Sequence, residues 1–335
     1  MKFKRLVPVF IIAFLYVLFF ANVEYVKNSL LNSIYFCVKT LIPSVFPFIL
    51  LSSLIVNTGI FNSFFLNDIF KPLYKLGICR IYLSSIVSGS LSGYVTGAKC
   101  ICDITDKKAA QKDEFTNAVI LSSNAGLGFV ISCVGALIWK NLLFGIYIYF
   151  SQLIISLLLG ALILPKAKDE NTFFVPNEKG MINAITDSVG SAASSVIIIS
   201  SYVISFSLLC DIASILLPSP LSTAIYPIME FCNGAFKCLE FSNIYVKAFF
   251  TGFTVGFGGI CVHFQIFSIC NEFPLNKRVF FLFKLLQGIL LGMVAIIYIS
   301  CIHNIKALPI ELLLLISVTL LIKIIFKRRT LSFSA

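Results

Sequence analysis

The amino-acid sequence predicts an all-α membrane protein: a bundle of about eight transmembrane helices with additional re-entrant or broken helices. Of the 335 residues, 59% are hydrophobic and only 12% are charged, and the mean hydropathy is +0.98. Soluble domains carry roughly a quarter charged residues, so a water-soluble fold could not cover this much apolar surface. The apolar residues also gather in runs near the length of about 20 residues that crosses a bilayer as a helix.

Eight such runs are candidate spans. They are Leu6 to Val23, Leu41 to Leu66, Phe115 to Trp139, Asn141 to Pro165, Ser188 to Cys210, Ala248 to Asn271, Leu285 to Ile305, and Leu308 to Ile322. The first run has a basic start and no small-residue cleavage site after it, which predicts a retained helix with a cytoplasmic N-terminus. The basic tail at residues 327–335 favours a cytoplasmic C-terminus as well, and therefore an even number of crossings.

The net charge of +11 does not indicate a nucleic-acid partner. Lys and Arg stand in short clusters between the apolar runs, which is the pattern of membrane-flanking charges. The eleven Cys residues form no CxxC pair, and several lie inside apolar runs, where a thiol acts as a small hydrophobe. We therefore expect a lipid bilayer as the main partner, and neither a metal site nor a cofactor.

Two apolar segments are poor candidates for simple spans. The segment from Ile81 to Ala98 contains five Ser and three Gly residues, and the segment from Ile212 to Met229 contains three Pro residues. Interruptions of this kind point to broken or re-entrant helices that line the substrate site of a transporter. The alternative for the first segment is a close-packed helix that uses Gly89, Gly93 and Gly97 at four-residue spacing.

A polar stretch in mid-chain divides the sequence into two halves with a similar order of hydropathy. Each half has a Ser-containing span, a Gly-rich segment and two closing spans, and this order matches Ile81 to Ala98 with Ala248 to Gln265. We expect an inverted two-fold repeat, and the sequence leaves the topology of the Gly-rich segments open. The expected boundaries are an N-terminal transmembrane helix at 1–29, a first repeat at 30–165, a polar linker at 166–180, a second repeat at 181–326 and a basic tail at 327–335.

Four motifs contain candidate site residues. The substrate-binding candidates are Ser92, Gly93, Tyr94, Thr96, Gly97, Lys99, Asn124, Gly126, Asn233, Gly234, Gly258, Gly259 and Gln265. Small residues and hydroxyls in the Ser92 to Lys99 motif allow a binding site that is lined by backbone groups. Lys99 either adds a cation that could bind a carboxylate or is one more charge flanking the membrane. Asn124, inside an apolar run, is expected to bond a neighbouring helix or a substrate.

Glu230 and His263 are candidates for ion coupling or gating. Glu230 follows a long uncharged run, and an ionisable group at membrane depth is a functional candidate. The alternatives are a Glu at headgroup level and a buried neutral His bonded to a backbone carbonyl. The chain has two His residues and no HExxH, GxSxG or P-loop motif, so we expect a protein that is not an enzyme and that uses an ion or solute gradient.

At these motifs the chain resembles the nucleoside-recognition or Gate domain family, especially the YlbJ-type sporulation integral membrane proteins. The matching pieces are Leu41 to Phe48, Ser92 to Lys99, Asn124 to Gly135, Glu230 to Gly234, and Gly256 to Gln265. The family has Pro at the positions of Val95 and Leu127. The resemblance implies a spore-forming bacterium, a multi-pass protein of the cell membrane or the forespore outer membrane, and a role in passing dipicolinate to the forespore.

Three functions compete at this point. The first is a secondary transporter of a small organic solute of the dipicolinate type, coupled to a proton or cation. The second is a nucleoside or nucleobase carrier, and the third is a non-transporting membrane scaffold for spore assembly. Lys99 in the site would favour an aromatic acid, whereas a buried pair of Glu230 and Asn233 would favour ribose hydroxyls. The sequence is also compatible with a homo-oligomer.

Overall fold

The computed structural model describes residues 2–58, 82–105, 111–164, 180–219 and 221–303, and within these ranges every regular element is a helix. The elements up to residue 164 are α1 (Lys2–Ala21), α2 (Val23–Phe36), η1 (Cys37–Leu41), α3 (Ile42–Asn57), α6 (Leu83–Ser92), α7 (Tyr94–Ile104), α8 (Lys112–Ser122), η4 (Phe129–Ile138) and α9 (Leu142–Ile163). Those from residue 180 are α10 (Met181–Leu216), α11 (Leu221–Met229), α12 (Phe231–Lys237), η5 (Cys238–Glu240), α13 (Ile244–Phe257), α14 (Gly259–Ile269) and α15 (Lys277–His303).

The described residues contain five helices long and apolar enough to cross a membrane. They are Val23–Asn57, Leu142–Ile163, Met181–Leu216, Ile244–Ile269 and Lys277–Ile302. The helical class and the membrane setting expected from the sequence are thereby confirmed, and the chain is a multi-pass membrane protein. The number of about eight spans stays a prediction, and the run at 308–322, most of the linker at 166–180 and the tail at 327–335 lie outside the described residues.

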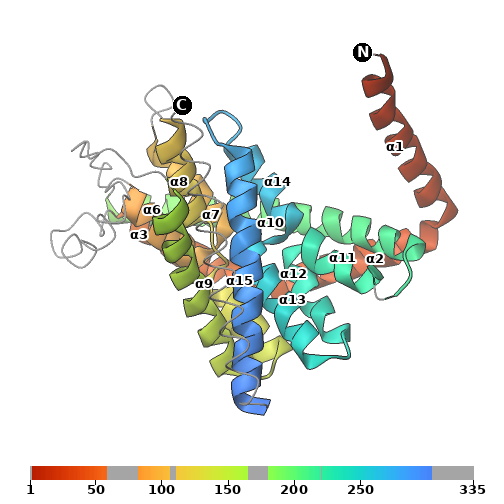
Figure 1. Ribbon diagram of the computed structural model, residues 1–335. Helices are drawn as coiled ribbons and strands as arrows, with labels where there is room; N and C mark the ends of the chain where they lie inside the picture. The colour runs from red at the N-terminus through yellow and green to blue at the C-terminus, as the bar shows by residue number, and fades with distance from the viewer. Residues whose placement is uncertain (1, 59–81, 106–110, 165–179, 220, 304–335) are drawn as a thin grey trace, which may run out of the picture.

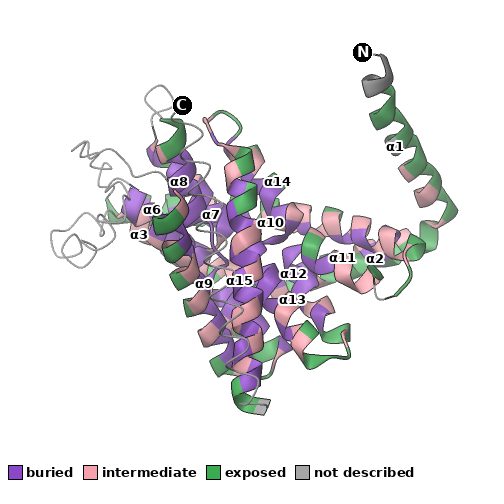
Figure 2. Ribbon diagram, viewed as in Figure 1, coloured by how far each residue is buried: buried purple, intermediate pink, exposed green. Residues whose placement is uncertain are grey.

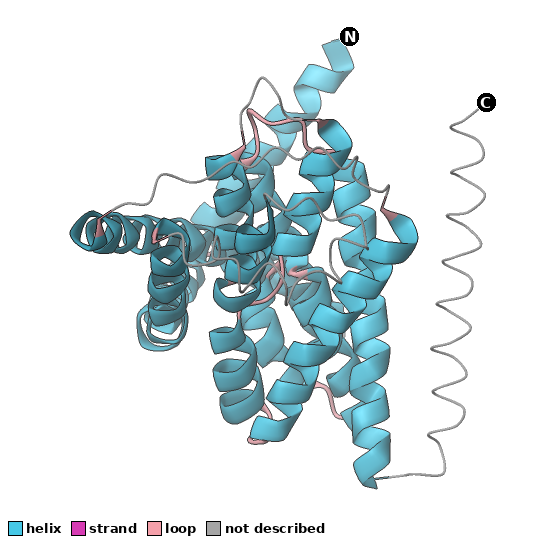
Figure 3. Cartoon of the chain, turned by 90° about the vertical axis from the view of Figure 1, so that its left-hand side faces the viewer, coloured by secondary structure: helices cyan, strands magenta, loops and turns pink. Residues whose placement is uncertain are grey.

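The helices run in two main directions. In Figure 1, α9, α13 and α15 stand side by side, whereas α2 and α10 run across to one side of them, and α1 stands apart. The view turned by 90° also shows two directions, with long helices standing upright and other helices seen nearly end-on to one side (Figure 3). Figure 2 shows buried residues concentrated where these helices meet and exposed residues along outer faces. On α9 the exposed face is apolar, with Leu143 68%, Phe150 55% and Leu158 58% exposed, as suits contact with lipid tails.

Small residues bring α13 and α15 into close contact. A methyl group at Gly252 would lie 2.5 Å from the carbonyl oxygen of Leu291, and one at Gly256 would lie 2.7 Å from the Cα of Gly288. Glycines four residues apart let two helix backbones approach in this way. The Gly-rich motif of the second half therefore serves packing along α13, before the helix is interrupted at Gly258.

The two segments predicted to be broken are both interrupted, in different ways. α6 and α7 form an antiparallel pair that turns at Gly93, where φ is +117°, and Gly89 then packs against Gly97 across the pair. The close packing of Gly89 and Gly97 thus belongs to a hairpin of two short helices and not to one straight helix. In the other segment α10 ends at Leu216 and α11 begins after a gap, at Leu221.

The expected span from Phe115 to Trp139 is also divided. α8 ends at Ser122, and the π-helical element η4 begins only at Phe129. The last interruption lies between α13 and α14, where Gly258 and Gly259 have φ values of +81° and +72°. Only glycine adopts such conformations without strain, so these residues end one helix and start the next.

Candidate functional site

Four helix interruptions meet at one place inside the molecule: the α6–α7 turn, the α8–η4 break, the junction of α11 with α12 at Glu230, and the α13–α14 break. The gap between α10 and α11 is not one of them. A methyl group at Gly126, in the break between α8 and η4, would lie 2.8 Å from the carbonyl of Ser92 at the α6–α7 turn. One at Gly259, between α13 and α14, would lie 3.3 Å from the backbone of Glu230, which joins α11 to α12. Backbone without helical hydrogen bonding is tolerated inside a membrane only where protein buries it or a cavity adjoins it.

Tyr94, at the α6–α7 turn, contacts two of the other interruptions. Its hydroxyl donates a hydrogen bond to the carbonyl of Val255 near the end of α13, and its ring lies against Gly258. The same ring meets Phe231 edge to face, with centroids 5.5 Å apart. These contacts place the α6–α7 turn beside the break between α13 and α14.

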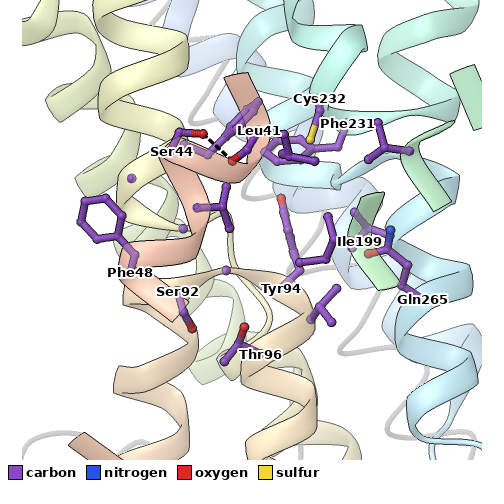
Figure 4. A pocket seen from close by; sticks show the side chains of 18 of the residues that line it. Leu41, Ser44, Phe48, Ser92, Tyr94, Thr96, Ile199, Phe231, Cys232 and Gln265 are labelled. Carbon is purple, nitrogen blue, oxygen red and sulfur yellow. Dashed lines mark hydrogen bonds between the residues drawn. The ribbon is translucent and has the colours of Figure 1, made fainter. Parts of the chain in front are cut away.

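A cavity of about 50 Å³ lies at this meeting point (Figure 4). Its lining residues are Leu41, Ser44, Val45, Phe48, Ser92, Gly93, Tyr94, Val95, Thr96, Gly126, Gly128, Phe129, Ile199, Val203, Glu230, Phe231, Cys232, Cys261, Val262 and Gln265. In Figure 4, Tyr94 points up toward Phe231 from α7, and Gln265 of α14 lies on the opposite side from Ser44 of α3. A volume of this size holds a few water molecules, so a ring-bearing solute requires the lining helices to move apart.

The lining offers hydrogen-bond donors from α7. This helix begins at Tyr94 without a side-chain cap, so its first-turn N–H groups have no partner within the helix. The hydroxyl of Thr96, in the same turn, is buried and has no hydrogen-bond partner in the described part of the chain. Because Thr96 lines the cavity, its hydroxyl and the adjacent helix N-terminus are groups that a bound solute could satisfy.

Glu230 supplies the carboxylate of the cavity. It is 0% exposed and caps α12, because its two oxygens accept hydrogen bonds from the backbone N–H groups of Cys232 at 2.7 Å and Asn233 at 2.5 Å. A carboxylate at a helix N-terminus is stabilised by the helix dipole and by these N–H groups. Each oxygen keeps a lone pair, so the carboxylate can still accept a hydrogen bond from a solute.

Seven of the fifteen predicted site residues line the cavity, and the others have different surroundings. Those in the lining are Ser92, Gly93, Tyr94, Thr96, Gly126, Glu230 and Gln265. Gly258 and Gly259 lie just behind it, at the break of α13 and α14. Gly97 packs against the Ser122 carbonyl and Gly234 against Pro227, so both serve close helix contacts.

Lys99 does not lie at the cavity. Its ammonium donates to the hydroxyls of Ser191 at 3.1 Å and Ser194 at 3.4 Å, both on α10. Asn233 donates through its side chain to Ser207 at 2.6 Å and lines a separate polar cavity beside Asp211. The pair of Glu230 and Asn233 that would favour ribose hydroxyls is formed only through the backbone N–H of Asn233.

His263 has the surroundings of a structural residue. Its Nδ1 donates to the carbonyl of Gly259 at 2.8 Å, and aromatic rings of Phe257, Phe280 and Phe281 surround the imidazole. Its Nε2 is buried without a hydrogen-bond partner among the described residues. The bond to a backbone carbonyl is the alternative that the sequence already offered for this residue.

Sequence reasoning missed three buried polar residues around Asn124. Lys284 and Gln287 of α15 and Gln152 of α9 are each 0% exposed. Gln287 donates to Asn124 Oδ1 at 2.9 Å, and Gln152 bonds both backbone groups of Ala125, at 2.7 and 3.3 Å. The available signal was an amide or ammonium inside an apolar run, which is costly in a membrane unless it has partners.

Comparison with known proteins identifies no relative: no family model matches the chain, and neither a curated protein nor a solved structure does.

Proposed function

We propose that this chain is a secondary transporter of a small organic solute and that the cavity at the four helix interruptions is its binding site. The observation that carries the proposal is the meeting of these interruptions at a cavity with unsatisfied polar groups. Transporters place discontinuous helices in this way because free backbone groups at helix ends can bind a solute near mid-membrane. A purely structural bundle gains nothing from four such interruptions, each of which gives up helical hydrogen bonds.

The groups in the lining favour an uncharged, ring-bearing solute, of the nucleoside or nucleobase class. The α7 N-terminus and Thr96 can donate to oxygen or nitrogen acceptors, and Glu230 can accept from a hydroxyl or N–H group. The rings of Tyr94, Phe129 and Phe231 offer apolar faces for a flat solute. None of the lining residues is a Lys, Arg or His, so a dianion would be in direct contact with one carboxylate and with no cation.

A dipicolinate-type aromatic acid is the second candidate. The uncapped N-terminus of α7 supports it, because helix N-termini bind anions. Transport of that solute would agree with the sporulation role that the family resemblance implies. It would also agree with a location in the cell membrane or the forespore outer membrane. Spores from a strain without this protein would then contain little dipicolinate although the cells still make the acid.

The test compares uptake of radiolabelled uridine, adenine and dipicolinate into proteoliposomes that hold the purified protein. Thr96→Val keeps the shape of the side chain and breaks no hydrogen bond within the described structure, so the fold should be unaffected. It should weaken the apparent affinity for the true substrate by roughly 2- to 10-fold, the value of one net hydrogen bond. Thr186→Val, at an exposed position on α10, is the matched control and should change nothing.

The outcomes separate the candidate functions. Uridine or adenine uptake that Thr96→Val weakens supports the uncharged solute, and the same result with dipicolinate supports the aromatic acid. If none of the three solutes enters the proteoliposomes faster than it enters protein-free liposomes, the transport proposal fails for these solutes. A non-transporting scaffold is then the favoured function. Uptake that Thr96→Val leaves unchanged would place the binding site elsewhere.

A further inference from the structure

Lys284 places a positive charge inside the protein next to the interruption between α8 and η4. Its side chain is 0% exposed and its ammonium donates to the backbone carbonyl of Ser123. It also lies 2.9 Å from Oε1 of Gln287 and 3.5 Å from Oδ1 of Asn124. No Asp or Glu in the described part of the chain forms an ion pair with it.

The oxygens around Lys284 are held in place by further hydrogen bonds. Nε2 of Gln287 donates to Asn124 Oδ1 at 2.9 Å and to the carbonyl of Gln152 at 3.2 Å. Gln152 in turn bonds the carbonyl and N–H of Ala125. The amide orientations follow from this network, so the carbonyl-type oxygens of Asn124 and Gln287 must both face the ammonium.

This arrangement has the chemistry of a site for a monovalent metal ion. Carbonyl and amide oxygens replace the hydration shell of alkali cations, and carbonyls exposed where a helix unwinds commonly coordinate Na⁺ in transporters. The carbonyl end of α8, which terminates at Ser122, adds partial negative charge at the same place. The hydroxyl of Ser123 is buried without a hydrogen-bond partner in the described residues and is a further oxygen at the break.

The charge also lies close to the solute cavity. The Lys284 ammonium is 5.7 Å from the centroid of the Tyr94 ring, and Tyr94 lines the cavity. A cation over an aromatic face is attracted by the negative face of the ring. The Lys284 ammonium therefore contacts both the break after α8, through the Ser123 carbonyl, and the α6–α7 turn at the cavity, through the Tyr94 ring.

We propose that Lys284 is a tethered cation that occupies a monovalent-cation site formed by Ser123, Asn124 and Gln287. The ammonium supplies the charge that a dissolved ion would otherwise bring, so the wild-type protein needs no Na⁺ at this place. Removal of the ammonium opens the site, and Na⁺ then binds there. The consequence for transport, uptake that is independent of Na⁺, rests on the proposed function, whereas the binding site itself does not.

The test measures thermal unfolding of the purified protein in detergent, in choline chloride and in increasing NaCl at constant ionic strength. The wild type should unfold at the same temperature in both salts. Lys284→Ala should unfold about 5 °C or more lower in choline, because three buried oxygens lose their cation, and saturating NaCl should restore much of that shift. Direct binding of ²²Na⁺ to Lys284→Ala, and none to the wild type, should accompany the recovery.

Two variants act as controls. Lys284→Met fills the same space without charge, so it should be destabilised and gain nothing from NaCl. Lys277→Ala removes an exposed charge from the same helix and should show no difference between the salts. Adding Asn124→Ala to Lys284→Ala should abolish the recovery in NaCl, because one of the coordinating oxygens is then missing.

The proposal is overturned if Lys284→Ala is folded and unfolds at the same temperature in both salts, or if the wild type itself is stabilised by NaCl relative to choline. If Lys284→Ala does not fold, the comparison of the wild type in NaCl and in choline chloride still tests the proposal. None of these readouts uses a transported solute, so a failure of the transport proposal would leave the cation site standing. Na⁺-dependent uptake by the wild type, in contrast, would overturn the tethered cation while supporting transport.

Discussion

Glu230 is a residue whose structural and functional roles coincide. As the cap of α12 it holds two backbone N–H groups, and it also faces the cavity. Glu230→Gln keeps one acceptor oxygen but turns an amide N–H₂ toward a backbone donor and removes the charge. We expect the variant to insert into the membrane while uptake falls about tenfold, the equivalent of roughly 1.4 kcal/mol, within the range for loss of a helix cap.

The measurement for Glu230→Gln is initial uptake rate per amount of protein in the membrane. Glu24→Gln, at an exposed acid of α2, is the matched control and should transport normally. Normal uptake by Glu230→Gln would mean that the carboxylate only caps the helix.

Tyr94 offers a second test at the scale of one residue. Tyr94→Phe removes the hydroxyl that bonds the Val255 carbonyl and keeps the ring contacts with Phe231 and Gly258. Because the carbonyl is left unsatisfied in a buried position, the free energy of unfolding should fall by about 1 to 3 kcal/mol. Denaturant or thermal unfolding measures the loss, and Tyr35→Phe, 65% exposed on α2, should be neutral. Equal stability of the two variants would argue against the hydrogen bond.

Single residues were predicted from the sequence where their chemistry contrasts with their surroundings. Asn124 stands alone in an apolar run, and the expected bond to a neighbouring helix is present, with Gln287 of α15. Lys284 was not predicted, because it follows Lys277 and Arg278 and so looks like one more flanking charge. Only the direction of α15, which carries Lys284 into the interior, distinguishes it from them.

At the scale of elements, glycines decide which helices approach and which turn. The sequence predicted an interruption in the Ile81 to Ala98 segment, which turns at Gly93, because a stretch rich in glycine does not favour a straight helix. It could not reveal that α7 returns antiparallel along α6, since the return depends on contacts with α8. The paired short helices α6–α7 correspond in order to α11–α12, and the interrupted helix α13–α14 to α8–η4. If the halves are repeats, this order replaces the pairing inferred from hydropathy.

The α6–α7 contact predicts the effect of one added methyl group. In Gly97→Ala the new Cβ would lie 2.1 Å from the carbonyl oxygen of Ser122 and 2.9 Å from the Cα of Gly89. Both neighbours are backbone, so the helices must separate, and we expect a loss of about 1 to 3 kcal/mol in stability together with reduced uptake.

Gly190→Ala is the matched control for Gly97→Ala. Nothing lies within 4 Å of a Cβ at Gly190, which is also within a helix, so this variant should be neutral or stabilised by up to about 1 kcal/mol. Thermal unfolding of the two proteins side by side gives the comparison. If Gly97→Ala is as stable as Gly190→Ala, the contact with Ser122 does not limit the size of the side chain at residue 97.

At the scale of the whole molecule, hydropathy identified the membrane class but not the course of the chain. The run from Phe115 to Trp139 is uncharged and mostly apolar, yet its middle is irregular backbone held by Gln152 and by the α6–α7 turn. The hydropathy of a segment predicts that it lies in lipid or inside the protein, but it does not predict whether the backbone runs straight or turns. The site could be predicted as a set of interrupted segments, whereas the meeting of these interruptions required the three-dimensional structure.

Two neighbouring cysteines allow a test of whether the α6–α7 pair moves relative to the second half of the chain. Cys102, near the end of α7, and Cys270, directly after α14, have sulfur atoms 3.5 Å apart. If the cavity opens by movement of these helices, as the size of a ring-bearing solute requires, a covalent link between α7 and α14 should stop transport. Oxidation with copper phenanthroline should join the two sulfurs, lower uptake severalfold, and be reversed by dithiothreitol. Cys102→Ser should transport normally with and without the oxidant. A disulfide between Cys102 and Cys270, verified by peptide mass spectrometry, together with undiminished uptake would mean that α7 and α14 move as one body, and that the cavity opens between other helices.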